Sequence, residues 1–201
     1  SAYSNFYGGS FVFDGTGDNL TTPASSDFNF AGGDYTIEWW QWWNAATGYQ
    51  SIFDVGYTDA DSLLMQSKTG EAKFYVYVSG TDIFQEAIAA PLQTWTHYAL
   101  VRNGNSVKLY RNGIVSGSAT NSGTAHGSST HTFYVGGDES GYEFNGYIQD
   151  FRVYKGVAKY TKNFIPASTN PDILPDTPSG VAYSSALTKV TDGSVAFDGT
   201  G

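Results

Sequence analysis

Two acidic loops carry the side chains with the clearest chemical potential in this sequence. One places Asp59 and Asp61 two residues apart, directly before a candidate strand, and the other contains Asp138 and Glu139 among glycines. Hard cations such as Ca²⁺ bind several oxygen atoms, which loop carboxylates and carbonyls supply. These four carboxylates are therefore candidate calcium ligands. The alternative is that both loops are solvated acidic surface that keeps the protein soluble.

A second candidate cation site consists of Asp14, Asp18 and Asp150. The first two flank a Gly-Thr-Gly turn, and Asp150 lies in a candidate strand two residues before Arg152. A structural calcium ion is one interpretation of this group. The other is that Asp14 caps the turn by accepting hydrogen bonds from backbone N–H groups, as short carboxylates do, while Asp150 pairs with Arg152 or Arg102.

Tyrosines in and beside the acidic loops suggest a sugar site, because an aromatic face can cover the C–H surface of a sugar while amides and carboxylates bind its hydroxyls. Tyr49 and Tyr77 are further candidate aromatics near polar loop residues, although a loop tyrosine on its own is more often a packing residue. The candidate ligand-binding residues are Tyr57, Asp59, Asp61, Asp138, Glu139 and Tyr142.

The sequence contains no recognisable catalytic constellation. A retaining glycosidase needs two carboxylates about 5–5.5 Å apart, whereas Glu139 and Glu143 lie four residues apart in a glycine-containing loop. His97 lies within a candidate strand, and we expect solvated roles for His126 and His131 in a Gly/Ser/Thr-rich loop. There is no serine nucleophile elbow and no glycine-rich phosphate loop. We therefore expect a protein that is not an enzyme.

Composition favours a strand-rich domain and excludes several partners. The chain has 201 residues, 24 of them glycine, and 16% of its residues are aromatic, which is typical of strands and turns. Ten basic against 19 acidic residues give a net charge of −9, which disfavours nucleic acid and anionic membrane surfaces. Cysteine is absent, and no stretch approaches the roughly 20 apolar residues of a membrane helix, so we expect no membrane insertion.

Alternating apolar residues between Gly, Asn and Asp clusters predict an all-β fold. Asn-Gly pairs at 103–104 and 112–113 predict two tight hairpins that join three strands into an antiparallel meander. The only helical-looking stretch is 157–160. The candidate strands are Ser10–Phe13, Tyr35–Trp43, Gln50–Val55, Ser62–Gln66, Ala72–Val78, Thr81–Ile88, Thr94–Arg102, Ser106–Arg111, Ile114–Gly117, Thr132–Val135 and Gly146–Tyr154.

The candidate strand Tyr35–Trp43 carries tryptophan on both faces. Ile37, Trp39, Gln41 and Trp43 would share one face, and Thr36, Glu38, Trp40 and Trp42 the other. One interpretation is a central strand covered on both sides. The other is an exposed platform on which Trp40 or Trp42 stacks against a sugar.

Three segments together resemble the laminin-G-like modules of the concanavalin A-like lectin/glucanase superfamily, in the expected order over residues 10–166. They are Phe13-Asp14-Gly15 with Asn19-Leu20 and Tyr35–Trp40, then Trp95–Arg102 with Val107–Tyr110 and Asn112-Gly113, then Val135-Gly136-Gly137 with Phe144–Tyr154. The resemblance implies a two-sheet antiparallel β-sandwich, the concanavalin A-like jelly roll. The aromatic, Gly/Ser/Thr-rich character is similar to that of modules in phage virion or tail proteins and marine bacterial surface proteins.

The resemblance also bears on the site. Pentraxins, a branch of the same superfamily, bind calcium through loops in corresponding places, so the resemblance implies a calcium role for Asp59, Asp61, Asp138 and Glu139. The hydrolases of the superfamily carry a Glu-x-Asp-x-x-Glu strand, and none of the five glutamates here begins that pattern.

A repeat links the two ends of the sequence. Residues 10–17 recur 184 residues later as residues 194–201, with six of eight positions identical. A period of that length fits a whole domain. We therefore expect a module at 1–166, a Pro/Ser/Thr-containing linker at 167–193, and the first strand of a following tandem repeat at 194–201. We expect Ser194–Phe197 to be disordered or to pair with a sheet edge.

These observations predict a non-catalytic carbohydrate-binding or adhesion module, assisted by calcium and repeated within a larger extracellular, cell-surface or virion protein. Its partners would be a glycan or glycosylated surface and neighbouring modules or subunits. The alternative is a structural spacer or decoration domain that makes protein–protein contacts and binds no sugar.

Overall fold

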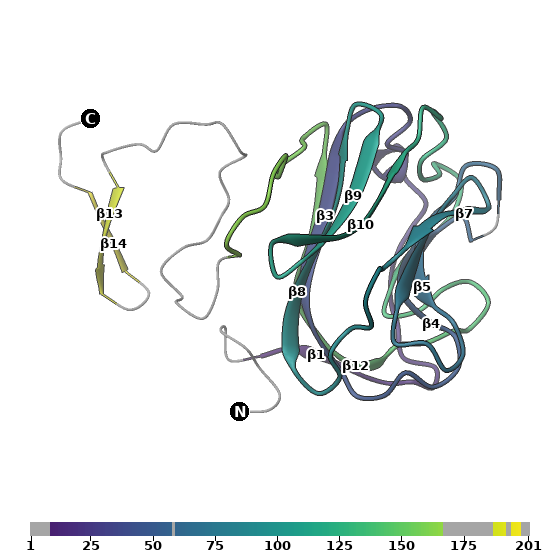
Figure 1. Cartoon of the computed structure of the whole chain (residues 1–201), viewed down its shortest axis with the longest axis horizontal. Helices are drawn as coiled ribbons and strands as arrows, with labels where there is room; N and C mark the ends of the chain where they lie inside the picture. The colour runs from purple at the N-terminus through teal and green to yellow at the C-terminus, as the bar shows by residue number, and fades with distance from the viewer. Residues whose placement is uncertain (1–8, 58, 167–186, 192–193, 198–201) are drawn as a thin grey trace.

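Two six-stranded antiparallel sheets face one another across an apolar core (Figure 1). The computed structural model describes residues 9–57, 59–166, 187–191 and 194–197. Within these residues the only helical element is a single 3₁₀ turn, η1 (Ser26–Phe28). The predicted all-β, two-sheet antiparallel sandwich is therefore confirmed.

The first sheet is built around a long central strand. Its strands, in spatial order, are β1 (Phe11–Asp14), β12 (Asn145–Lys155), β3 (Tyr35–Trp43), β8 (Trp95–Asn103), β9 (Ser106–Arg111) and β10 (Ile114–Thr120). The β8–β9–β10 meander turns at the two Asn-Gly pairs, as predicted. At the second of these turns Asn112 and Gly113 both adopt positive φ (50° and 78°), the backbone that a type I′ hairpin requires.

The second sheet consists of shorter strands and carries the loops on which the candidate site depends. In spatial order they are β2 (Leu20–Thr22), β11 (Phe133–Val135), β4 (Gln50–Val55), β5 (Leu63–Ser67), β6 (Phe74–Val78) and β7 (Thr81–Gln85). β2 was not predicted, because its three residues are all exposed and show no alternation. The helical-looking stretch 157–160 contains no helix, so that expectation is wrong.

One side of the sandwich is closed by a contact between the outermost strands of the two sheets. The amide of Ala87, just after β7, donates to the carbonyl of Ser116 in β10 at 2.8 Å. Gly117 permits this approach, because a Cβ there would lie 2.7 Å from the ring of Phe84. The two sheets therefore meet along β7 and β10.

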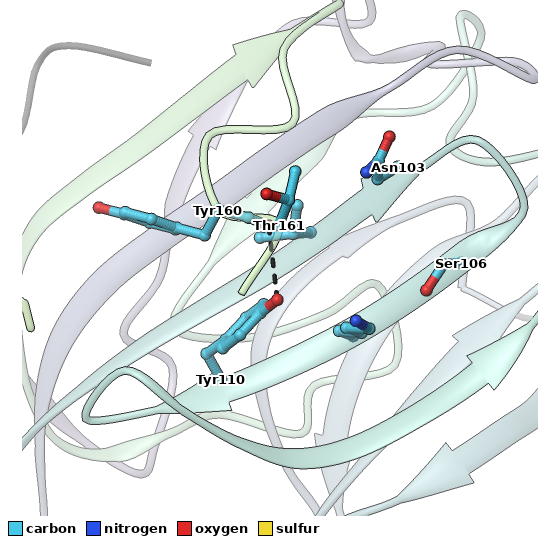
Figure 2. Close-up of a pocket in the computed structure, with 7 residues that line it drawn as sticks. Asn103, Ser106, Tyr110, Tyr160 and Thr161 are labelled. Atoms are coloured by element: carbon cyan, nitrogen blue, oxygen red, sulfur yellow. Dashed lines mark hydrogen bonds between the residues drawn. The ribbon is translucent and has the colours of Figure 1, made fainter. Parts of the chain in front are cut away.

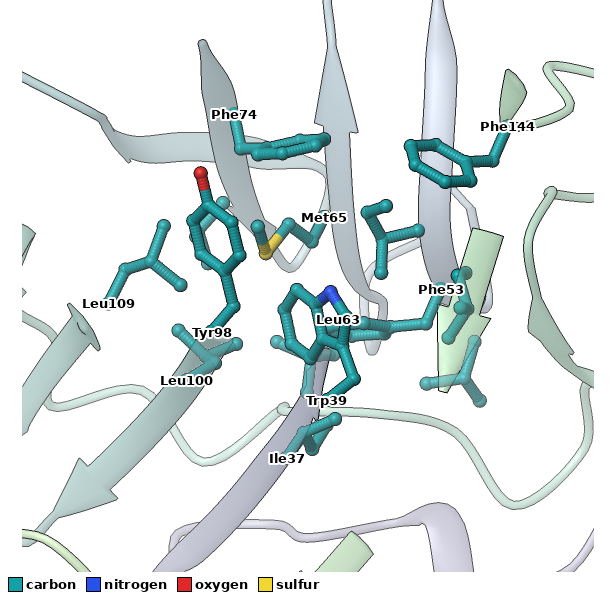
Figure 3. Close-up of a cluster of buried hydrophobic side chains, with 14 of the residues drawn as sticks. Ile37, Trp39, Phe53, Leu63, Met65, Phe74, Tyr98, Leu100, Leu109 and Phe144 are labelled. Atoms are coloured by element: carbon teal, nitrogen blue, oxygen red, sulfur yellow. The ribbon is translucent and has the colours of Figure 1, made fainter. Parts of the chain in front are cut away.

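The core is dominated by aromatic rings that both sheets contribute (Figure 3). The ring of Trp39, on the central strand β3, stacks on Tyr98 with centroids 5.6 Å apart and meets Phe53 of the opposite sheet edge-on at 5.9 Å. On the other face of β3, Trp40 is only 7% exposed. Trp40 therefore offers no platform for a sugar, whereas Trp42 is partly exposed, with its ring centroid 6.3 Å from that of Trp95. The interpretation of a central strand covered on both faces is confirmed for every residue of β3 except Trp42.

An irregular segment, residues 157–166, crosses the outer face of the first sheet. Glu38 is buried beneath it, where its two carboxylate oxygens accept from Nζ of Lys159 at 2.6 Å and from the hydroxyl of Tyr160 at 2.7 Å. Thr36 fixes the same segment by donating to the carbonyl of Val157 at 2.9 Å. Much of this outer face is therefore covered.

A separate two-stranded sheet lies near the C-terminus. β13 (Leu187–Thr191) pairs antiparallel with β14 (Ser194–Phe197). The strand expected at 194–197 is present, and its partner comes from the stretch that we assigned to a linker. The rest of that linker (167–186 and 192–193) and the end of the repeat (198–201) lie outside the described residues.

The first prediction concerns Gly136, which leads from β11 into the loop containing Asp138. A Cβ at this position would lie 2.2 Å from the buried ring of Phe13, and its φ is +79°. Gly70 also has positive φ (+74°), but a Cβ there meets nothing within 4 Å. Both Gly→Ala changes place a side chain on a residue with positive φ, which lowers stability by about 1–2 kcal/mol. Only Gly136→Ala adds an overpacking cost of about 1–3 kcal/mol.

Urea denaturation of the two variants measures this difference in the free energy of unfolding. We expect Gly136→Ala to be less stable than Gly70→Ala by roughly 2 kcal/mol. Equal losses in the two variants would show that Phe13 is not packed against the Gly136 backbone.

Candidate functional site

The outer face of the second sheet is lined by tyrosines and polar groups. On β6, Phe74, Val76 and Val78 are buried in the core, so the intervening Tyr75 and Tyr77 project outward and are partly exposed. Strand register aligns two outward rows across the sheet. One row is Ser51–Gln66–Tyr75–Gln85 and the other is Tyr134–Asp54–Leu64–Tyr77–Asp82.

Charged groups hold the tyrosine rings of β6 in place. Nζ of Lys68 lies 4.0 Å from the centroid of the Tyr75 ring and 2.7 Å from Oδ2 of Asp82, which combines a cation–π contact with an ion pair. The hydroxyl of Tyr75 donates to the carboxylate of Glu71. Burial raises the pKa of Tyr77 to about 12, so its hydroxyl stays protonated at physiological pH. This surface combines flat rings with oriented polar groups.

Three further tyrosines, each from a different loop, gather around Tyr142. The rings of Tyr49 and Tyr142 lie 5.1 Å apart between centroids, and those of Tyr57 and Tyr142 lie 6.5 Å apart. All three are candidates from the sequence, and the structure brings them together. We call Tyr49, Tyr57 and Tyr142 the tyrosine rim.

Asp138 anchors the loop that carries Tyr142. It is buried, and its Oδ1 accepts from the amides of Ser140 at 2.9 Å and Tyr142 at 3.1 Å. Its Oδ2 accepts from Oγ of Ser51 at 2.5 Å and Nε2 of Gln66 at 2.9 Å. Because protein donors occupy both oxygens, Asp138 acts as a structural anchor, which differs from the ligand role expected for it.

Asp54 is the central residue that the sequence analysis missed. It is fully buried at the end of β4, where Oδ1 accepts from the amide of Tyr57 at 2.8 Å and Oδ2 from the amide of Glu139 at 3.4 Å. Its carboxyl group thus joins the two loops. Burial raises its pKa to about 7, with a smaller contribution from the nearby charges of Asp138 and Glu139. No local signal identifies it, because β4 also contains the polar Gln50 and Ser51, and the enclosure of Asp54 depends on which loops meet over it.

The expected set of four calcium ligands is not assembled. Among the described residues, one group of three metal-ligating side chains has all its ligand atoms within 4.8 Å of one another, and it consists of Asp59, Asp61 and His131. Asp138 and Glu139 are not members of it. His131, expected to be merely solvated, lies with Nε2 3.0 Å from Oδ2 of Asp59.

Asp14, Asp18 and Asp150 do not form one cluster. Oδ1 of Asp14 accepts from the amide of Thr16 at 2.8 Å, and Oδ2 of Asp18 accepts from the amide of Asp14 at 3.2 Å. Asp14 pairs with Asn145 at the start of β12, whereas Asp150 lies five residues further along that strand, about 17 Å away at the usual rise. Asp150 pairs instead with Nε of Arg152 at 2.7 Å. The structure shows the turn-capping and ion-pair alternatives.

The other two histidines are structural. His97 is buried within β8, as expected, and burial lowers its pKa to about 3. His126 was expected to be solvated, but it is fully buried, with Nδ1 3.1 Å from the hydroxyl of Tyr35, and burial lowers its pKa to about 4. Both imidazoles are therefore neutral at physiological pH.

A small pocket lies on the opposite side of the molecule, where residues 160–161 rest against β8 and β9 (Figure 2). Tyr110 forms its floor and donates a hydrogen bond at 3.5 Å to the carbonyl of Tyr160. Its polar lining comes from Asn103, Ser106, Lys108 and Thr161. This pocket is the seam between the covering segment and the first sheet, and none of the expected site residues lines it.

Comparison with protein families decides the class of the chain. Residues 14–159 match the family model described as the concanavalin A-like lectin/glucanases superfamily. The chain belongs to this superfamily. A search of curated proteins finds no match. Within the described residues, no helix is long and apolar enough to cross a membrane.

Several solved structures share the fold of this superfamily member. Domain 4 of AbnA, an extracellular GH43 arabinanase from Geobacillus stearothermophilus in complex with arabinotriose, has a TM-score of 0.59 and 22% identity, covering 77% of this chain and 74% of that one. The Ruminococcus gnavus sialidase CBM40 bound to α2,3-sialyllactose has a TM-score of 0.52 and 15% identity, covering 69% and 89%. Domains LG4-5 of the mouse laminin α1 chain have a TM-score of 0.55 and 14% identity, covering 74% and 42%. At these identities the likeness shows the fold alone.

The second prediction follows from the raised pKa of Asp54. Between its ordinary value of 3.8 and about 7, the folded protein holds a proton that the unfolded chain releases, so this group makes the protein less stable as pH rises through that range. Asp54→Asn keeps an oxygen to accept from Tyr57 and cannot ionise. We expect this variant to lack the Asp54 part of the pH dependence of stability. Its free energy of unfolding should therefore increase relative to that of wild type as pH rises.

The measurement is the free energy of unfolding of wild type and Asp54→Asn at about pH 5 and about pH 8. The difference in the free energy of unfolding between the two proteins at each pH separates the contribution of Asp54 from those of other titrating groups. A difference that stays the same at both pH values would contradict the raised pKa.

Proposed function

We propose that this protein is a non-catalytic glycan-binding module that takes sugars on the outer face of its second sheet. The observation that carries the proposal is the set of partly exposed tyrosine rings, Tyr75 and Tyr77 on β6 and the tyrosine rim. The polar side chains of Lys68, Glu71 and Asp82 lie at the rings of β6. Aromatic faces of this kind bury the apolar side of a sugar while polar neighbours bind its hydroxyls. The superfamily and the sugar-bound relatives support the same function.

The charge of this face favours neutral sugars. Glu71 and Asp82 lie on it or at its edge, and Glu139 is exposed in a neighbouring loop. Lys68, the cation over the Tyr75 ring, is already paired with Asp82 at 2.7 Å. A carboxylate-bearing sugar such as sialic acid would therefore meet repulsion from these acidic groups. We propose neutral glycans as the ligand class.

The two buried carboxyl groups of the site are placed for support rather than for hydrolysis. Glycosidase carboxylates must touch the substrate on either side of the scissile bond. Asp54 is 0% exposed and Asp138 3% exposed, and both accept hydrogen bonds from the protein itself. Neither can reach a substrate, which favours a module without catalytic activity.

We further propose that the module acts outside the cell or on a virion, repeated within a longer protein. The recurrence of residues 10–17 at 194–201 supports the repetition, and linked copies would raise weak sugar affinities through avidity. A second candidate function is a structural module that contacts neighbouring protein. A small apolar patch favours it, where Ile88 is 69% exposed and Ile114 57% exposed.

The third prediction tests the glycan face. A glycan array should show binding to neutral oligosaccharides and not to their sialylated forms. In titration calorimetry with the best ligand, Tyr75→Ala should weaken binding at least tenfold, about 1.4 kcal/mol, because the stacking surface is lost. Tyr75→Phe keeps the ring and should bind nearly as wild type.

Phe11→Ala is the matched control, because Phe11 is an aromatic residue, 59% exposed, on β1 of the other sheet. It should leave sugar affinity unchanged. An array without neutral hits would favour the structural alternative, and equal losses in Tyr75→Ala and Phe11→Ala would remove the tyrosine face as the site.

A further inference from the structure

Asp59, Asp61 and His131 bring two carboxylates and an imidazole together at one end of the sandwich. Their ligand atoms all lie within 4.8 Å of one another. Zinc-type ions hold nitrogen and oxygen ligands at about 2.0–2.2 Å in tetrahedral geometry, which spaces those ligands about 3.3–3.6 Å apart. Nε2 of His131 and Oδ2 of Asp59 are already 3.0 Å apart. Small side-chain rotations would therefore let these three groups surround an ion.

Ser128 orients the imidazole of His131 through Nδ1, the ring nitrogen that does not face Asp59. This nitrogen lies 2.9 Å from Oγ of Ser128, a fully buried residue whose hydroxyl also accepts from the amide of Thr130 at 3.2 Å. A hydroxyl can donate to Nδ1 or accept from it. Ser128 can therefore accept from a protonated Nδ1 when Nε2 uses its lone pair for a metal, which is the usual support of a metal-bound histidine.

The two loops that supply these ligands are held together independently of the ligands themselves. Ser79, after β6, donates from its amide to the carbonyl of Ser62 at 3.0 Å and from its hydroxyl to the carbonyl of Ala125 at 2.9 Å. Gly56 lies directly between the loops, since a Cβ there would be 3.2 Å from Cα of Ser62 and 3.5 Å from Cβ of Ser128. Backbone contacts thus preorganise the site.

The donor set selects the class of ion. Calcium takes six to eight oxygen ligands and is not a typical partner of imidazole, whereas zinc and its first-row neighbours bind imidazole and carboxylate together. Three protein ligands leave one tetrahedral position open to water or another ligand. The Asp59 side chain is 60% exposed, so an ion can enter from solvent.

We propose that Asp59, Asp61 and His131 form a binding site for a divalent transition-metal ion of the zinc class, in place of the calcium site that the family resemblance implies. The proposal does not depend on glycan binding, because its test uses no sugar.

Titration calorimetry of the chelator-treated full chain with Zn²⁺ and, separately, Ca²⁺ tests the proposal as the fourth prediction. We expect one equivalent of Zn²⁺ to bind and Ca²⁺ to bind far more weakly. His131→Ala should abolish Zn²⁺ binding, and Asp61→Asn should weaken it at least tenfold. Ser128→Ala, which removes the support of the imidazole, should weaken it about 10–100-fold. Co²⁺ should give visible ligand-field absorption in wild type that His131→Ala lacks.

Glu139→Gln is the matched control, because Glu139 is an exposed acid in the neighbouring loop that lies outside the group of three. It should leave Zn²⁺ affinity unchanged. Thermal unfolding of each variant in chelator confirms that it is folded. Three results would overturn the proposal: no Zn²⁺ binding, in which case Asp59 and His131 form an ion pair only; unchanged affinity in folded His131→Ala; or tighter binding of Ca²⁺ that Glu139→Gln reduces.

Discussion

Two buried carboxyl groups position the loops that carry Tyr57 and Tyr142. Asp54 joins the loop of Tyr57 to the loop of Glu139 through their backbone amides, and Asp138 ties the loop of Tyr142 to β4 and β5. Removing a carboxylate from water is costly unless donors surround it. Here those donors are the amides of the loops themselves, so the requirement to satisfy two buried groups fixes the arrangement of the tyrosine rim.

The two sheets differ in how their outer faces are used. The first is largely covered by residues 157–166, which Lys159 and Tyr160 fasten to the buried Glu38. The second has no such cover over β6, where Tyr75 and Tyr77 remain partly exposed. The chain thus covers most of one outer face with its own segment and leaves the tyrosines of β6 partly exposed on the other. Because of this asymmetry, the proposed glycan face lies at the tyrosines of β6 and not at the tryptophans of β3.

Sequence patterns predicted the fold well because strand alternation is a local property. The bounds of β3, β4 and β9 agree with the expected strands, and Asn-Gly turns placed the meander. The site was predicted only in part, because its assembly depends on which loops meet. Tyr57 and Tyr142 do meet, but Asp138 turned inward and Asp150 pairs with Arg152. Asp54 and His131 were missed because nothing local shows that one is enclosed and the other faces Asp59.

The contact between β7 and β10 reduces the length of strand edge that the sandwich exposes to neighbouring molecules. An unpaired strand edge is a template on which another chain can form hydrogen bonds, and proteins that expose long edges tend to aggregate. By bonding Ala87 to Ser116, the sandwich turns two of its four outermost strands toward each other. Many copies held side by side along a fibre or surface would therefore have fewer edges through which neighbours could fuse into continuous sheets.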